Sequence, residues 1–446
     1  MREDIVALIK EAGIVGAGGA GFPTHVKVSA PAEVVIVNGA ECEPLLRVDQ
    51  QLMQFEAAKV VKGLEAVMEA TGASQGVIAL KAKYKAAKEA LTEEIKGRPV
   101  KLFTLGDFYP AGDEHVTVYE VVKRVVPEGG IPLKVNCVVS NVETLINIAN
   151  ALEGAPVTDS FLTVTGEVPK PITVKLPIGT SIAEALALAG LKDLAGKVVI
   201  EGGPMMGKVV ADVGAPITKT TKGIIVLPEA HPLVQRKKLS LAHQLRRSKA
   251  ACIQCSRCTD VCPRYMLGHR LQPHKIMCSL NYLRGDEQVV RMSLLCSECG
   301  ACEYGCPMEL SPRQVNAALK QELAQKGIKL ESASQSPVPE LTREYKKIPV
   351  KRLIIRMGLT RYDCPAPLTA VEFKPKKVTI PLQQHIGAPA EPTVDVGEWV
   401  EKGAEIARTK EGALGANIHA SISGVITAIT DCIVIETRDR EAAKEC

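Results

Sequence analysis

The sequence predicts a multidomain protein of mixed α/β and α+β class, with a helical cysteine-rich module in its second half and a small all-β domain at its C-terminal end. Three observations lead to this prediction. The chain has 446 residues, and domains of roughly 100–200 residues predict three or four units. Short apolar strands alternate with amphipathic helices over the first third of the chain. Two cysteine motifs of the same spacing occupy residues 240–320, and short β runs separated by Gly and Pro follow residue 378.

The composition argues against several classes of protein. Apolar residues make up 46% of the chain and aromatic residues 3%, so its cores rest on Val, Ile, Leu and Ala. A net charge of +5, with both signs mixed along the chain, argues against a nucleic-acid-binding protein. Met1 to Lys10 does not resemble a secretory signal, and no run approaches the roughly 18 apolar residues of a membrane span. We therefore expect a cytoplasmic protein without a membrane span, in which the 14 cysteines favour metal binding over disulfides.

The first predicted domain, residues 1–155, is an α/β unit. Its apolar residues alternate between helical spacing and short continuous runs, which is typical of strands buried between helices. In chain order we expect a helix at 3–12, a strand at 34–37, a helix at 50–70, a strand at 76–80 and a helix at 81–95.

The remaining domains are predicted from changes in residue composition and hydrophobic pattern along the chain. Residues 156–236 contain strand-like runs, one short helix at 181–188 and Gly-rich turns, which predicts a small mixed sheet. Residues 237–322 hold the cysteine motifs, and the polar residues 323–373 are typical of an extended connector. Residues 374–446 should form the small all-β domain.

The two cysteine motifs are the strongest chemical signal in the chain. Each has the spacing Cys-x2-Cys-x2-Cys-x3-Cys-Pro, which lets one loop hold three corners of a [4Fe-4S] cluster while its fourth Cys ligates the neighbouring cluster. Two [4Fe-4S] clusters are therefore predicted. On this rule one cluster takes Cys252, Cys255, Cys258 and Cys306, and the other takes Cys296, Cys299, Cys302 and Cys262.

Structural zinc is the alternative, but zinc sites use well-separated Cys pairs rather than three thiols within seven residues. Six further cysteines are expected to be buried and inert in the main, and Cys278, between the motifs, is not expected to be a ligand.

A Gly-rich loop follows the first predicted helix. Gly16, Gly18 and Gly21 match the Gly-x-Gly-x-x-Gly pattern, yet a helix precedes this loop and Pro23 follows it, which is the wrong context for a Rossmann dinucleotide site. Glycines still allow backbone N–H groups to approach a phosphate, and Lys27 adds positive charge. The residues alone leave both a phosphate site and an ordinary turn open.

Four ordered segments resemble the flavoprotein subunit of respiratory complex I. They are the loop from Gly16 to Lys27, the segment Asn38 to Pro44, the turn Tyr109 to Glu114 and the stretch Ser140 to Thr144. The resemblance implies a site for FMN and NADH. Two positions, Ala40 and Ser140, depart from the family's pattern and put individual flavin contacts in doubt. The implied cofactor-binding residues are Gly16, Gly18, Gly19, Lys27, Asn38, Glu41, Glu43, Tyr109, Asp113, Glu114, Ser140, Asn141 and Thr144.

The later domains also carry resemblances. Residues 160–210 are similar to a soluble-ligand-binding β-grasp (SLBB) domain, and residues 378–430 resemble the barrel-sandwich hybrid domain of the C-type component of the Rnf electron-transport complex. In the Rnf component that domain comes first, whereas here it comes last. This order, with the segments 202–207 and 348–354, resembles the cobalamin (corrinoid) reductases of propanediol-utilisation microcompartments.

The resemblance implies an NADH-dependent iron–sulfur flavoprotein. NADH would reduce FMN, and single electrons would pass through both clusters to cobalamin or a redox protein. A microcompartment shell protein or an adenosyltransferase would be a partner, and the enclosed location would be a bacterial microcompartment. The alternative is a non-enzymatic conduit of the Rnf type. His385 and His419 could ligate cobalt, but structural histidines are the stronger expectation, and no Lys marks a swinging arm.

Overall fold

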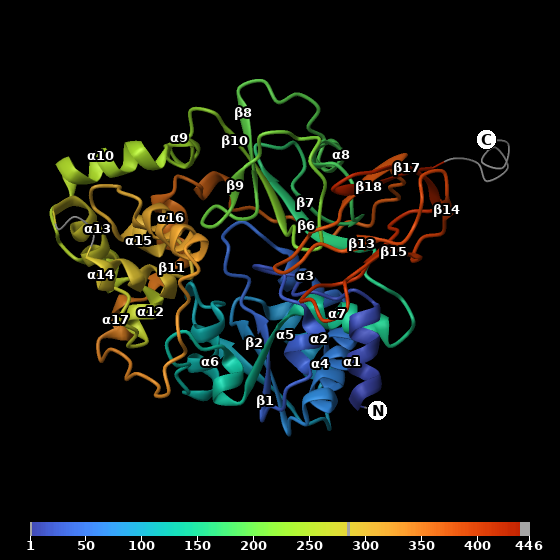
Figure 1. Cartoon of the computed structure of the whole chain (residues 1–446), viewed down its shortest axis with the longest axis horizontal. Helices are drawn as coiled ribbons and strands as arrows, with labels where there is room; N and C mark the ends of the chain where they lie inside the picture. Colours follow the sequence, from blue (N-terminus) through green and yellow to red (C-terminus); the bar gives the residue numbers. More distant parts are fainter. Residues whose placement is uncertain (1, 283–285, 438–446) are drawn as a thin grey trace.

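The computed structural model describes residues 2–282 and 286–437 (Figure 1). Its first unit contains a parallel sheet in the order β3-β2-β1-β5, as expected for an α/β domain. The central strands β1 and β2 are buried almost throughout because helices cover both faces of the sheet, whereas the edge strand β3 is partly exposed. Their bounds are β1 Val34–Gly39, β2 Gln75–Lys81, β3 Val100–Leu105 and β5 Cys137–Asn141.

Helices bury the two faces of this sheet in separate cores. One core takes residues of α1 Arg2–Glu11, α3 Val48–Phe55, α4 Ala57–Thr71, α5 Lys85–Glu94 and α7 Val142–Ala151. The other takes residues of α6 Glu114–Val122. The short helix α2 Thr24–Val28 follows the Gly-rich loop, and a 3-10 turn spans Pro132–Val135.

Two helix predictions in this unit were inaccurate at their bounds. The expected helix at 50–70 is two helices, because Glu56 leaves the helical conformation with ψ near 27°. The bend allows α3 to pack on α5 while α4 packs on α7. The helix expected from residue 81 begins at Lys85, since β2 extends through Lys81.

The second unit is the expected small mixed sheet with one crossing helix. Its strand order is β7-β6-β10-β8-β9, and only the β6–β10 pair is parallel. Helix α8 Ile182–Leu188 begins with a capping box between Ser181 and Glu184. The strands are β6 Asp159–Gly166, β7 Ile172–Pro177, β8 Lys197–Glu201, β9 Lys208–Val209 and β10 Gly223–Pro228.

The cysteine-rich unit is helical, and its loops carry the two motifs. Its longer helices are α9 Pro232–Lys238, α10 Leu241–Ala251, α13 Pro273–Tyr282 and α16 Pro312–Gln325. Its shorter helices are α11 Arg257–Asp260, α12 Pro263–Met266, α14 Glu287–Arg291 and α15 Ala301–Gly305, and a 3-10 turn spans Met292–Leu295. This unit packs beside the second sheet and beside α6 of the first unit (Figure 1).

The expected extended connector was only partly correct. Strand β11 Ile348–Pro349 pairs antiparallel with β4 Phe108–Tyr109 of the first unit. Helix α18 Val350–Arg356 buries Val350, Leu353 and Ile354, a helical spacing that the surrounding Lys and Arg residues obscured. The segment also contains α17 Arg343–Lys346 and a 3-10 turn at Thr360–Tyr362.

The last unit is the expected small β domain, built from two sheets. The order of the first is β12-β18-β17-β14, and that of the second is β13-β15-β16. The unit packs back on the N-terminal unit, where Ile386 N donates to Ala20 O at 2.9 Å. The strands are β12 Lys377–Pro381, β13 Glu391–Pro392, β14 Trp399–Val400, β15 Glu405–Arg408, β16 Ile418–His419, β17 Gly424–Ile429 and β18 Cys432–Glu436.

Within the described ranges 2–282 and 286–437, none of the helices combines the length and the apolar character that a bilayer span requires.

Candidate functional site

A cavity of about 710 Å3 lies at the carboxyl ends of β1 and β5, where parallel α/β sheets generally bind ligands. The Gly-rich loop, the loop after β1 and the turn after β4 form one side. The loop Gly202 to Gly207 and residues 220–222 of the second unit form another, and the second cysteine motif closes the cavity near Cys299. Its volume falls in the range of roughly 300–1,000 Å3 found for small-molecule and cofactor sites.

The structure brings only part of the predicted flavin set to this cavity. Seven of the predicted residues line it: Gly18, Gly19, Glu41, Glu43, Tyr109, Asp113 and Asn141. Six are not among the residues that line it: Gly16, Lys27, Asn38, Glu114, Ser140 and Thr144.

The two asparagines fix loops around the cavity. Asn38 Nδ2 donates to Gly112 O at 2.8 Å, and Asn38 Oδ1 accepts from Ala40 N. Asn141 Oδ1 accepts from Glu143 N at 2.9 Å and thereby caps α7, while its Nδ2 donates to Asp49 Oδ2 at 3.0 Å. Both amides therefore hold the shape of the cavity wall.

Lys27 and Thr144 are also engaged by protein groups. Lys27 Nζ donates to Val139 O at 2.9 Å and pairs with Glu114 at 3.1 Å. Thr144 Oγ1 accepts from Ala17 N at 2.9 Å, which ties the Gly-rich loop to α7. The buried Ser140 hydroxyl has no hydrogen-bond partner among the described residues. A phosphate role for Lys27 would require it to leave its present contacts.

The cavity is also lined by six charged residues that the sequence reasoning missed: Asp49, Glu201, Lys208, Lys222, Glu298 and Lys320. Asp49 Oδ1 is buried and has no hydrogen-bond partner in the described part of the chain. Lys222 forms an ion pair with Glu143, and burial lowers the pKa of Lys222 to about 7. Burial and the Asp49 carboxylate raise the pKa of Glu41 to about 7. Asp49 could have been found from the sequence, because it is an acidic residue directly before the helix expected at 50–70.

This cavity, called the flavin cavity below because the resemblance implies FMN there, offers both room and an acceptor to a ligand. Gly19 has a φ of +71°, and a Cβ there would meet no atom within 4 Å, so the loop leaves open space above its backbone. Asp49 lines the same space, and its buried Oδ1 has no hydrogen-bond partner among the described residues, so this oxygen is free to accept from a ligand N–H or O–H group.

Glu43 holds the second unit against the cavity. Its carboxylate accepts hydrogen bonds from Met205 N and Met206 N, both at 2.8 Å. A Cβ at Gly203 would lie 2.1 Å from Glu43 Oε2, so the close approach requires glycine. Burial raises the pKa of Glu43. Glu43 therefore acts in the structure as a clamp between two units.

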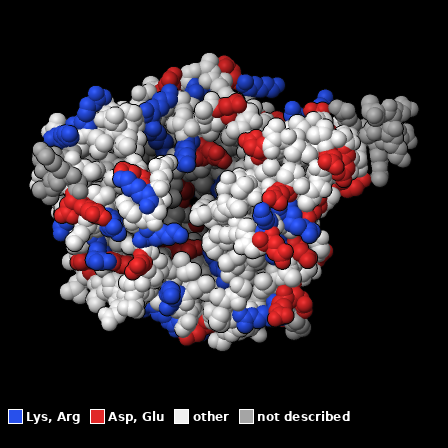
Figure 2. All heavy atoms as spheres, in the orientation of Figure 1, with Lys and Arg blue, Asp and Glu red and all other residues white. Residues whose placement is uncertain are grey.

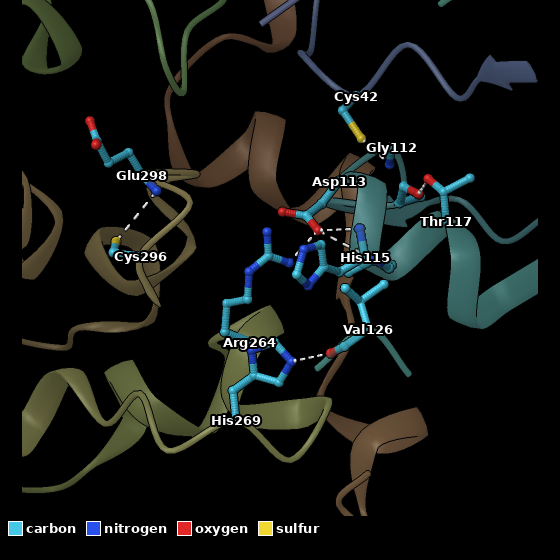
Figure 3. A network of polar contacts seen from close by, with 12 residues as sticks. Cys42, Gly112, Asp113, His115, Thr117, Val126, Arg264, His269, Cys296 and Glu298 are labelled. Carbon is cyan, nitrogen blue, oxygen red and sulfur yellow. Dashed lines mark hydrogen bonds and ion pairs between the residues drawn. The ribbon is translucent and has the colours of Figure 1, made fainter. Parts of the chain in front are cut away.

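Asp113 and Arg264 join the flavin cavity to the cysteine-rich unit (Figure 3). Arg264 Nη1 lies 2.5 Å from Asp113 Oδ1, and the two side chains are 11% and 8% exposed. Asp113 also caps α6 by accepting from His115 N and Val116 N. Burial alone would raise the pKa of Asp113, but the Arg264 guanidinium holds that pKa below its ordinary value.

The eight motif cysteines separate into two groups of four, each around its own small cavity. Both groups combine three thiols from one motif with the fourth thiol of the other motif. One cavity is lined by Cys252, Cys255, Cys258 and Cys306. The other is lined by Cys262, Cys296, Cys299 and Cys302.

The second group adjoins the flavin cavity. Cys299 lines both cavities, and Tyr109 Oη donates to Cys299 O at 2.5 Å. Asn316 Nδ2 lies 3.7 Å from Cys296 Sγ, and Glu298 N donates to the same sulfur at 3.3 Å. Donors to a ligand sulfur stabilise its thiolate form and raise the potential of a cluster bound there.

Cys278 lines neither cysteine cavity, although it contacts Cys252. Cys42 accepts from Gly112 N, and burial raises the pKa of Cys42 to about 11. Cys137 is buried, Cys364 and Cys432 are half-buried, and Cys446 lies outside the described residues.

Neither histidine of the C-terminal unit is among the residues that line these cavities. His385 Nε2 accepts from Ala416 N at 2.9 Å, and His419 is 7% exposed. Burial lowers the pKa of His419 to about 4. The Nδ1 atom of each ring is buried and has no hydrogen-bond partner among the described residues.

Comparison with known families assigns each unit. Residues 9–150 match the Nuo51 FMN-binding domain, residues 161–209 the SLBB domain, residues 251–311 a 4Fe-4S dicluster domain and residues 366–443 the RnfC barrel sandwich hybrid domain. The expected kinds of domain are therefore confirmed.

Curated relatives extend the match to nearly the whole chain. A protein of Salmonella typhimurium named "Cobalamin reductase PduS" is 45% identical over 98% of this chain and 97% of its own length. A protein of Citrobacter freundii with the same name is 45% identical over 95% of this chain and 94% of its own length. A component of the proton-translocating ferredoxin:NAD(+) oxidoreductase complex of Clostridium ljungdahlii is 34% identical over 59% of this chain and 56% of its own length.

Proposed function

Because this chain belongs to the cobalamin reductase PduS family, we propose that it passes electrons from NADH, through FMN and two [4Fe-4S] clusters, to the cobalt of a corrinoid. One observation carries the proposal. The cavity at the carboxyl ends of β1 and β5 and the cavity of the second cysteine group share Cys299. A flavin bound in the first cavity would therefore lie directly beside the second cysteine group.

The cofactors would supply the redox chemistry: FMN accepts two electrons together from a nicotinamide and releases them singly, and each cluster carries one electron. The protein supplies position and environment. Gly18 and Gly19 leave room at the loop, Asp49 offers an acceptor, and Tyr109 links the cavity wall to the backbone of Cys299.

Eight cysteines would hold the clusters in crossed groups. Cys306 would complete the group of the first motif, and Cys262 would complete that of the second. The crossing requires the two loops to lie side by side, and α11 and α15, which belong to different motifs, are in contact. A structural zinc ion binds four ligands at one site, and zinc would not require that the two motifs exchange their fourth cysteines.

An anaerobic NADH titration tests the proposal. The purified full-length protein should lose its flavin absorbance near 450 nm on addition of NADH, and added hydroxocobalamin should then be reduced with restoration of the oxidised spectrum. If NADH leaves the bound flavin oxidised, the NADH-linked activity is wrong. Activity that requires an added partner protein would favour the Rnf-type conduit instead.

A variant pair tests the flavin cavity. Asp49→Asn keeps an oxygen for the contact with Asn141 but places an amide NH2 group where the unpartnered Oδ1 lies, so we expect FMN to bind about tenfold more weakly, as for loss of a charge-assisted hydrogen bond. Asp159→Asn, on β6 and paired with Lys402 at 3.0 Å, is the matched control and should leave FMN binding unchanged. Equal affinity in both variants would count against FMN in this cavity.

We further propose that the protein works inside a bacterial microcompartment, beside a shell protein or an adenosyltransferase that takes the reduced corrinoid. The support is the family membership, together with the need to pass a reduced cobalt to a consuming enzyme. Co-sedimentation of the tagged protein with intact compartments would support this location, and its recovery entirely in the unsedimented fraction would refute it.

A further inference from the structure

A second cavity, of about 740 Å3, adjoins the flavin cavity and is basic. The two cavities share Gly207, Lys208, Glu298 and Lys320. Five cationic side chains line this second cavity, but only two carboxylates do. The cations are Lys208, Arg236, Lys237, Arg313 and Lys320, and the carboxylates are Glu298 and Glu303. Figure 2 shows a hollow at the centre of this face, with Lys and Arg along its rim and Asp or Glu beside and within it.

The cations come from three elements and converge on one space. Lys208 lies on β9, Arg236 and Lys237 lie at the end of α9, and Arg313 lies on α16. The chain brings these elements together through backbone contacts: Lys237 Nζ donates to Gly207 O at 2.6 Å, and Arg313 donates to Met205 O at 3.1 Å. These contacts fix the cations in place but do not neutralise them, because carbonyl groups carry no net charge.

Four carboxylates face the five cations, because Glu309 and Glu43 act on them from outside the lining, so the cavity keeps a modest positive charge. Glu298 pairs with Lys320 at 3.2 Å, and Glu303 accepts from the hydroxyl of Ser311. Arg236 reaches Glu309 at 3.4 Å, but Glu309 is not among the lining residues. Burial, and to a smaller extent the like charge of Arg313, lowers the pKa of Lys237 to about 8. An anion placed between Lys237 and Arg313 would offset the repulsion of these like charges.

The rest of the wall suits a flat apolar group. Ala317, Ala318 and Ala324 present small side chains of α16, and Leu233 and Tyr304 lie across from them. A ligand with phosphate groups at one end and a flat ring system would match both halves of the cavity.

We propose that this basic cavity is a subsite for the phosphate group of a ligand whose reacting part lies in the adjoining flavin cavity or beside the second cysteine motif. The inference rests on the proposed function for its choice of ligand. Two ligands carry such a group: the pyrophosphate of NADH and the phosphodiester of the nucleotide loop of cobalamin. Either ligand would place its phosphate against the cations and its flat base against the alanines of α16.

Inorganic pyrophosphate is the first probe, because its binding does not require redox activity. Isothermal titration of the full-length protein should show binding that weakens with salt. The double variant Lys208→Gln/Arg236→Gln should weaken binding at least tenfold. Lys208→Gln alone should weaken it about threefold, and since Lys208 is exposed this variant should fold normally. Lys192→Gln, exposed on the same unit, is the control and should bind as the wild type does.

The second arm identifies the source of the phosphate. If the dinucleotide occupies the subsite, Lys208→Gln should raise the dissociation constant for NADH and leave that for cobalamin unchanged. If the corrinoid occupies it, the variant should weaken cobalamin but not cobinamide, which lacks the nucleotide loop. Unchanged binding of pyrophosphate, NADH and cobalamin in the double variant would overturn the subsite. Pyrophosphate binding in a protein whose flavin NADH fails to reduce would instead leave the subsite standing and refute the proposed function.

Discussion

Replacing Asp113 by Asn should reveal how strongly the flavin-binding unit is tied to the cysteine-rich unit. The amide oxygen can still cap α6, but Arg264 would lose its buried partner at 2.5 Å. Two unit charges about 4 Å apart attract by about 4 kcal/mol at an effective dielectric constant near 20. Removing one member of a buried pair generally costs about 3–5 kcal/mol, because the other charge stays buried. We therefore expect a loss of about 3 kcal/mol in the apparent free energy of unfolding.

Anaerobic urea unfolding, followed by cluster absorbance near 400 nm, measures this loss. The pKa of Asp113 is lowered, so the pair stabilises the fold above the ordinary carboxyl pKa of about 4 and the stabilisation disappears as the pH falls through the lowered value. The difference between wild type and variant should therefore be constant from about pH 5 to 8.

The matched control is an exposed pair of the same length. Arg124 Nη2 lies 2.5 Å from Glu33 Oε2, with side chains 37% and 54% exposed. Solvent screens that pair, so Glu33→Gln should leave the unfolding midpoint unchanged within error. If Asp113→Asn is as stable as Glu33→Gln, burial does not make the Asp113–Arg264 pair a structural tie, and the reasoning fails.

Three further changes probe the site. Tyr109→Phe leaves the Cys299 carbonyl without its donor, so the free energy of unfolding should fall by about 1–3 kcal/mol. The electron paramagnetic resonance signal of only one cluster should change. An unchanged spectrum would contradict the contact between Tyr109 and the loop of that cluster. The pKa of Glu41 is raised to about 7, so between about pH 4.5 and 7 the folded state holds a proton that the unfolded state has released, and the stability of the wild type should fall as the pH rises. In Glu41→Gln this decrease of stability with pH should be smaller. An unaltered pH dependence in urea titrations would refute the raised pKa of Glu41. Gly21→Ala would place a Cβ 2.8 Å from Thr220 Cγ2 at a φ of +69°, whereas the Cβ of Gly19→Ala would meet nothing within 4 Å at a similar φ. In thermal unfolding the Gly21 variant should therefore have the lower melting temperature. The reverse order would contradict the close packing of Gly21 against Thr220.

Local patterns explain why much of the fold was predictable. The apolar run in β1 is long enough to require cover on both faces, and the Ser181 and Glu184 spacing marks the start of α8. The break at Glu56 and the helix α18 were missed because both depend on partners distant in the sequence. In particular, Val350, Leu353 and Ile354 are buried only because that segment folds back beside β4.

The candidate site also has a part that local sequence patterns predict and a part that depends on distant residues. Cluster cysteines can be predicted because the ligands of one loop lie close in sequence, so spacing alone carries the information. The flavin cavity depends on three units, and two of its missed residues, Asp49 and Lys222, are 173 positions apart in the sequence. Resemblance located the loops, but it did not reveal that Lys27 is held by Val139 and Glu114 or that Glu43 clamps a neighbouring unit.

The arrangement of the cavities fixes an order for the proposed relay, and that order can be tested. Cys299 belongs to the group beside the flavin cavity, whereas Cys255 of the other group is exposed and follows Ile253, which is 62% exposed. The group containing Cys299 should therefore hold the inner cluster, and the group containing Cys255 the outer one.

Two serine variants separate these positions. In Cys255→Ser, NADH should still reduce the flavin and the inner cluster within one turnover, because neither lies beyond the damaged group. In Cys299→Ser, the flavin should be reduced while the outer cluster stays oxidised on the same timescale, since its electrons must cross the damaged group. Rapid-freeze electron paramagnetic resonance distinguishes the two, and Cys432→Ser, which alters a half-buried thiol on β18 of the C-terminal β domain, serves as the control. Equal rates of outer-cluster reduction in Cys299→Ser and in the control would mean that the electrons take another path, and the order inferred from Cys299 would be wrong.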